Sequence, residues 1–127
     1  MEIGSSPSLM PDLSLLENIK YFLYNDNINE NMISNVLNKY ELESFKRDPV
    51  RDFSSGMIKR SEIAIADLKN PKVLCIDEPR VYLDENGVDL LLNLITKREK
   101  EGSTSILSSQ ESIGAFTSIE RSFNLND

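Results

Sequence analysis

The sequence lacks histidine altogether and contains a single cysteine. Without imidazole, histidine metal ligands, Ser-His or Cys-His nucleophile pairs and an imidazole general base are all excluded. Cys75 cannot form an internal disulfide, and its place in the apolar run 73–76 indicates a buried strand residue rather than a reactive thiol. Any chemistry must therefore rest on carboxylates, hydroxyls and amides.

Glycine is scarce as well, and no Gly-Lys dipeptide occurs anywhere in the sequence. The sequence therefore has no G-x-x-x-x-G-K-[ST] phosphate-binding loop, or P-loop, whose backbone N–H groups and lysine hold the β- and γ-phosphates of a nucleotide. We expect the chain alone to lack an autonomous site for ATP. The five glycines are Gly4, Gly56, Gly87, Gly102 and Gly114.

Long apolar runs and an excess of basic residues are also missing. No run approaches the roughly 18–20 residues that span a bilayer, and the first ten residues have neither the basic nor the apolar region of a signal peptide. The formal charge of −7 opposes binding to a nucleic-acid backbone. The 127 residues, 39% apolar and 28% charged, indicate one globular domain without direct membrane insertion, which reaches a membrane only through a partner.

The first half of the chain has helical periodicity. Ser14 and Glu17 form a capping box ahead of apolar residues at helical spacing, which predicts a helix over 14–24. A second helix is predicted from the N-cap residue Asn29 onward, with apolar residues at helical spacing up to Tyr40. A loop with two serines and a glycine then leads into a third helical pattern.

The second half alternates strand and helix patterns. The apolar run 73–76 predicts a strand buried on both faces. Asp84 can cap a helix over about 85–100, after which 105–107 is a second predicted strand and 119–125 a weaker third. Such alternation implies parallel strands and an α/β fold.

Two acids, Asp77 and Glu78, end the first predicted strand. Acids at strand ends also serve solubility or capping, so the pair alone is compatible with a structural role. Open α/β sheets nevertheless bind ligands beyond the carboxyl ends of their strands, where adjacent acids can divide the tasks of nucleotide hydrolysis. Asp77 would then hold Mg²⁺, and Glu78 would orient and deprotonate the attacking water.

Four sequence segments follow one another at characteristic distances: FSSGMIKR at 53–60, LCIDEP at 74–79, YLDENG at 82–87 and ILSSQE at 106–111. Their order and spacing resemble the second half of an ABC-type ATP-binding subunit, in which a signature loop, a Walker B strand, a D-loop and an H-loop succeed one another. The resemblance covers roughly residues 1–112. The stretch 3–22, together with NGVDLL at 86–91, further resembles the heme-exporter subunits of cytochrome c biogenesis.

This resemblance implies ATP and Mg²⁺ as ligands. It also implies the roles already given, Asp77 as the Mg²⁺ ligand and Glu78 as the general base. Ser54 and Gly56 of the signature loop would contact the γ-phosphate held by an opposite subunit, where a helix start with glycine beside it suits an anion. Asp84 would couple two nucleotide sites across a dimer, and Gln110 would contact the γ-phosphate. From the residues alone, Ser54 and Asp84 are equally well explained as helix N-caps.

The chain departs from the family pattern at several positions. The family's Leu-Ser-Gly-Gly-Gln is Phe-Ser-Ser-Gly-Met at 53–57, which removes one glycine and the terminal amide. Gln110 replaces the H-loop histidine and carries no charge. Ser6 stands where the family's Q-loop glutamine would reach Mg²⁺.

The resemblance implies an incomplete P-loop NTPase fold of the ABC ATPase type. A mainly helical lobe with the signature loop is expected at 12–68, and the Walker B, D-loop and H-loop part of the α/β core, a partial parallel sheet, at 69–127. The family's P-loop precedes these segments, so we expect it upstream of Met1. Because the P-loop strand runs beside the strand matching 105–108, that sheet edge would be bare and the isolated chain only marginally stable.

Two hypotheses for function follow. The first is a partial ATP-binding subunit of an exporter, truncated or split, which works with transporter membrane subunits and with a second ATP-binding subunit or the missing N-terminal half. It would lie peripherally on the cytoplasmic face of an inner membrane, or on the mitochondrial matrix face. The second is a non-catalytic remnant or interaction module that docks on membrane subunits or on an intact ATPase. A chromosome-maintenance ATPase lobe is disfavoured because residues 1–50 show no sustained heptads.

Overall fold

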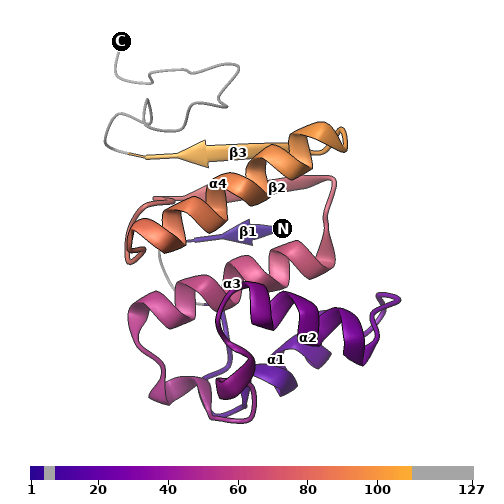
Figure 1. Cartoon of the computed structure of the whole chain (residues 1–127), viewed down its shortest axis with the longest axis vertical. Helices are drawn as coiled ribbons and strands as arrows, with labels where there is room; N and C mark the ends of the chain where they lie inside the picture. Colours follow the sequence, from indigo (N-terminus) through magenta and orange to yellow (C-terminus); the bar gives the residue numbers. More distant parts are fainter. Residues whose placement is uncertain (5–7, 110–127) are drawn as a thin grey trace.

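The computed structural model describes residues 1–4 and 8–109 of the chain. Within these residues, three strands and four α-helices pack around one core (Figure 1). The α/β fold that the sequence predicted is confirmed. In chain order the described elements are β1 (Glu2–Ile3), α1 (Leu15–Phe22), α2 (Glu30–Lys39), the 3₁₀ turns η1 (Glu43–Phe45) and η2 (Val50–Asp52), α3 (Ser55–Lys69), β2 (Val73–Asp77), α4 (Glu85–Lys100) and β3 (Thr104–Ser108).

Each helix begins at the cap that its sequence specifies. The Ser14 hydroxyl accepts from Glu17 N at 3.1 Å, and the Glu17 carboxylate accepts from Ser14 N at 3.0 Å, which completes the predicted capping box. At the start of α2, Asn29 Oδ1 accepts from Met32 N at 2.9 Å. The third helix ends because Asn70 adopts a left-handed backbone, with φ of 47°, ahead of a proline.

The sheet has the order β1-β2-β3, and all of its pairings are parallel. In register, Leu74 lies opposite Ser105, and Ile76 lies opposite Ile3 on one side and Leu107 on the other. The two residues of β1 are too few to show a period of two, so the sequence did not reveal this strand. The weak strand expected at 119–125 lies outside the described residues.

Only one face of this sheet is covered by the described elements. On that face Ile3, Leu74 and Ile76 are at most 1% exposed. On the opposite face Val73 is 46% and Ile106 is 51% exposed, and Cys75 between them is half-buried. The prediction of a strand buried on both faces was therefore wrong, because no element within 1–4 and 8–109 packs over the second face.

Buried charges join the helical segments to the rest of the molecule. Asp67 of α3 accepts from Lys39 Nζ at 2.8 Å and the Tyr40 hydroxyl at 3.0 Å, both in or next to α2, and from Lys97 Nζ of α4 at 3.2 Å. Burial alone would raise the pKa of Asp67, but the hydrogen bonds and charges of the two lysines outweigh it and hold that pKa below its ordinary value. Within the part of the chain described, no helix is long and apolar enough to cross a bilayer.

Candidate functional site

The two candidate acids lie at the carboxyl end of β2. Two consecutive serines hold them there, the last residue of β3 and the residue that follows it. Asp77 Oδ1 accepts from the Ser108 hydroxyl at 2.8 Å, and Glu78 Oε2 accepts from the Ser109 hydroxyl at 3.1 Å. The backbone N–H of Glu78 donates to the Ser108 carbonyl at 2.7 Å. Both carboxylates are therefore fixed beside the carboxyl ends of neighbouring parallel strands, where α/β sheets bind their ligands.

Glu78 has an unusual backbone conformation. Its φ of 50° lies in the left-handed region, which a residue with a side chain adopts at a cost of about 1–3 kcal/mol. Tyr82, four residues on, has a φ of 68°. Such conformations cluster at functional sites, where the surrounding structure holds them in place. The geometry therefore favours a functional role for the turn that begins at Glu78.

The start of α3 lies directly against this turn. A side chain at Gly56 would place its Cβ 3.1 Å from the Tyr82 carbonyl oxygen, which accounts for glycine at that position. Ser54 caps the helix, with its hydroxyl accepting from Met57 N at 3.2 Å. A hollow of about 210 Å³ lies beside this contact and is lined by Gly4, Ser55, Ile58, Lys59, Glu62, Glu78, Val81 and Tyr82.

Lys59 lies in the wall of that hollow and is only 5% exposed. Its ammonium donates to the carbonyl oxygens of Asp77 at 3.5 Å and Glu78 at 3.4 Å. Burial lowers the pKa of Lys59, although the charges of Glu62 and the two candidate acids act in the opposite direction. The two carboxylates thus accept from the last serine of β3 and from the serine that follows it, and the backbone carbonyls of the same two residues accept from one lysine of α3.

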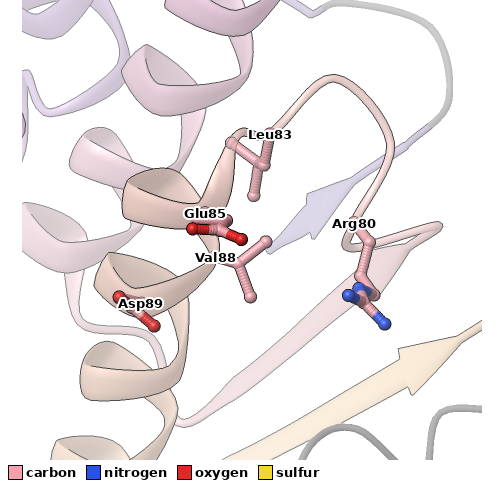
Figure 2. Close-up of a pocket in the computed structure, with 5 residues that line it drawn as sticks. All are labelled: Arg80, Leu83, Glu85, Val88 and Asp89. Carbon is pink, nitrogen blue, oxygen red and sulfur yellow. The ribbon is translucent and has the colours of Figure 1, made fainter.

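Asp84 caps α4, as its sequence position predicted. Its carboxylate accepts from Gly87 N at 2.7 Å, and a Cβ on Gly87 would lie 2.9 Å from the Leu83 side chain. A second hollow, of about 400 Å³, lies between this end of α4 and the turn after β2 (Figure 2). Arg80 lines it from the turn and two acids line it from α4, but it contains none of the predicted site residues.

The structure brings together some of the predicted residues but not all. Glu78 and Ser55 line the same hollow, and Gly56 lies against the Tyr82 carbonyl, so the turn after β2 adjoins the start of α3. Asp84 caps α4 at the far end of that turn. Gln110 falls outside the described residues. The sequence analysis gave no role to Ser108 and Ser109, although the two serines directly follow the predicted strand 105–107.

The chemistry of these residues fits one part of a nucleotide site. Mg²⁺ is usually bound by one or two carboxylates together with phosphate oxygens and water, and a lone Asp77 suits that pattern. Among the described residues no group of three or more His, Cys, Asp or Glu side chains could hold a metal by itself. A phosphate cradle does not fit any segment of this sequence, because the glycine-lysine motif is missing.

Two acids lie beyond the carboxyl ends of a parallel sheet, and the turn that begins at Glu78 contacts the glycine-containing start of α3. This is the edge at which open α/β proteins bind their ligands. Residues 3–81 match the model of the ABC transporter family, and the chain belongs to this family. The lantibiotic transport ATP-binding protein SrtF of Streptococcus pyogenes is 37% identical over 111 residues, which are 85% of this chain and 48% of that protein.

Two further relatives define how far the similarity extends. The cytochrome c biogenesis ATP-binding export protein CcmA of Histophilus somni is 28% identical over 113 residues, covering 87% of this chain and 52% of that protein. The dimeric ATP-binding cassette MJ0796, solved in a post-hydrolysis state with ADP and Pi, superimposes with a TM-score of 0.72 at 25% identity over 87% of this chain and 51% of that one. The chain spans about half the length of the curated relatives it matches.

Proposed function

We propose that this chain supplies the hydrolytic acids and the signature helix, α3, of an ABC transporter ATP-binding subunit, while polypeptide outside this sequence supplies the P-loop. The observation that carries this proposal is the pair Asp77 and Glu78, each held by a serine hydroxyl at the carboxyl end of the sheet. Glu78, in its left-handed turn, is the general base in this scheme, and Asp77 is the Mg²⁺ ligand.

The start of α3 would face the γ-phosphate bound by a second subunit. Ser54 already accepts a hydrogen bond from Met57 N, yet its O–H remains a donor that a phosphate oxygen can accept. Gly56 keeps the helix start close to the turn after β2. In this scheme Asp84 couples the two nucleotide sites across the dimer, and Gln110 contacts the γ-phosphate. ATP and Mg²⁺ would supply the reacting phosphate and its charge neutralisation.

The partners proposed are the polypeptide that carries the P-loop, a second ATP-binding subunit and the transporter's membrane subunits. The open sheet face with Val73 and Ile106 supports the first of these, because parallel sheets are normally covered on both faces. Residues 12–68 would form the lobe toward the membrane subunits, and 69–127 the α/β core. The location proposed is peripheral, on the cytoplasmic face of a membrane or on the mitochondrial matrix face.

Two relatives suggest different cargoes for the parent transporter. Heme export, which residues 3–22 and 86–91 suggest, is supported by 28% identity to the cytochrome c biogenesis protein. Transport of a lantibiotic is supported by the higher 37% identity to the streptococcal protein. We therefore propose an exporter ATPase, with a lantibiotic cargo favoured over heme by these identities.

A non-catalytic role is the second candidate, and two signature-loop residues favour it. Ser55 and Met57 replace the glycine and glutamine of the family pattern, which weakens phosphate contact. In that case the chain would dock on the membrane subunits or on an intact ATPase without turnover. An assay of ATP hydrolysis separates the two roles.

The assay compares the chain alone with the chain assembled with a polypeptide that carries a P-loop. Turnover is expected only in the assembly, and Glu78→Gln should lower it about 10²–10⁴-fold, the usual contribution of a general base. Glu99→Gln, at the exposed far end of α4, is the matched control and should leave turnover unchanged. A stable assembly without turnover would establish the non-catalytic role, and turnover by the chain alone would refute the divided site.

A further inference from the structure

Lys59 is a charged residue in a place that is costly for a charge. It lies one turn into α3 at 5% exposure, and its ammonium has two backbone carbonyls, those of Asp77 and Glu78, within 3.5 Å. Removing an ammonium from water is unfavourable unless hydrogen bonds replace the lost hydration. The two carbonyls therefore account for the presence of a lysine at this buried position.

The nearest acid on its own helix is engaged elsewhere. The carboxylate of Glu62 accepts from the backbone N–H of Ser8 at 3.4 Å and from the Ser8 hydroxyl at 3.2 Å. Burial raises the pKa of Glu62, while these hydrogen bonds and the charge of Lys59 lower it. The direct hydrogen bonds of Lys59 thus go to the backbone of the acids rather than to Glu62.

The turn that Lys59 reaches is short and internally bonded. Val81 N donates to the Glu78 carbonyl at 3.1 Å, so that carbonyl receives one bond from the turn and one from Lys59. The Tyr82 carbonyl at the other end of the turn lies where a Cβ on Gly56 would approach within 3.1 Å. The first turns of α3 therefore contact the turn at residues 78–82 at both of its ends.

We propose that Lys59 is a positioning residue, which holds the backbone of Asp77 and Glu78 against α3 so that the signature helix and the hydrolytic acids move as one unit. In an assembled ATPase, a shift of the helix start on binding phosphate would then displace the Glu78 turn directly. The expected effect on hydrolysis rests on the proposed function. The hydrogen bonds from Lys59 to the carbonyls of Asp77 and Glu78, here called the tie, lie within this chain and need no nucleotide.

The tie is tested first by amide hydrogen exchange on the full chain. In Lys59→Met, which keeps the length of the side chain without the charge, exchange at the amides of Glu78 and Val81 should accelerate at least about tenfold relative to amides inside α3. Lys59→Arg should restore protection, and Lys69→Met, at the exposed end of the same helix, should change neither amide. Lys59→Gln serves as the second variant if Lys59→Met does not fold.

Equal acceleration at all amides, or none at Glu78 and Val81, would overturn the proposal. In the assembly with a P-loop polypeptide, Lys59→Met should lower kcat about tenfold or more with KM for ATP unchanged, and Lys59→Arg should recover kcat. A raised KM with unchanged kcat would make Lys59 a nucleotide-binding residue instead. If exchange responds as expected but no assembly hydrolyses ATP, the proposed function fails while the tie stands.

Discussion

The helical segments and the sheet of this molecule differ in how completely they are buried. In the helical segments, Leu15, Ile19 and Leu37 are fully buried, so the apolar stripe of each helix meets a partner. In the sheet, Leu74 is fully buried but its neighbour Val73 is 46% exposed. The helical segments, here called the closed side, bury their apolar residues among themselves. The sheet, here called the open side, has a second face that the described residues do not cover.

This difference coincides with the division of the candidate site. The acids Asp77 and Glu78 lie at the end of the half-covered sheet, and the helix that would contact phosphate, α3, belongs to the closed side. A sheet that keeps one face open can receive further polypeptide, which in the proposed function carries the P-loop. The open face and the missing phosphate cradle are therefore two signs of the same incomplete domain.

The largest expected effect comes from the covered face. Leu74→Ala removes a fully buried side chain from β2 and should lower the free energy of unfolding by about 2–5 kcal/mol. Urea denaturation followed by circular dichroism measures this change. A loss no greater than that caused by Val73→Ala, on the opposite face, would contradict the assignment of the two faces.

A smaller effect is expected where the closed and open sides are joined. Asp67→Asn leaves Lys39, Lys97 and the Tyr40 hydroxyl without their shared carboxylate and should cost about 1–3 kcal/mol, reduced by the partial exposure of both lysines. Thermal unfolding at neutral pH measures the loss.

The pH dependence of the same variant gives an independent test. Because the folded-state pKa of Asp67 is lowered, its contribution is present above its ordinary pKa and is lost as the pH falls through the folded value. From about pH 4 downward, wild type should therefore lose stability more steeply than Asp67→Asn. Parallel curves for the two proteins would show that the carboxylate is not stabilised by the lysines.

The smallest effect on stability should come from the open face. Ile106→Thr replaces a half-exposed side chain with another β-branched one, and unfolding of the chain alone should change by no more than about 0.5 kcal/mol. Affinity for a P-loop polypeptide, measured by titration, should fall at least several-fold. Unchanged affinity would place the partner at another surface.

Local sequence signals predicted the helix starts well. Ser14, Asn29, Ser54 and Asp84 all cap the helices expected of them, because a cap depends only on residues within one turn. The strand at Val73–Asp77 and the acids at its end followed in the same way from a short apolar run. These elements needed no knowledge of distant contacts.

Buried charges could not be predicted, because their partners are far away in the sequence. Arg98 lies in the last turn of α4, where a cation is normally exposed, yet it is 1% exposed and donates to the carbonyls of Pro71 at 2.8 Å and Thr104 at 2.9 Å. The hydrogen-bond partners of Lys59 and Asp67 are likewise distant in the sequence. The exposure of Val73 was misjudged for the opposite reason, since the rule for parallel strands assumes that both faces are covered.

In the proposed function this chain holds the hydrolytic acids of a nucleotide site without the phosphate cradle. Isothermal titration of Mg-ATP into the chain alone, and into its assembly with a P-loop polypeptide, tests this claim. We predict no binding to the chain alone and saturable binding to the assembly. Tight binding of Mg-ATP by the chain alone, weakened by Asp77→Asn, would contradict the claim.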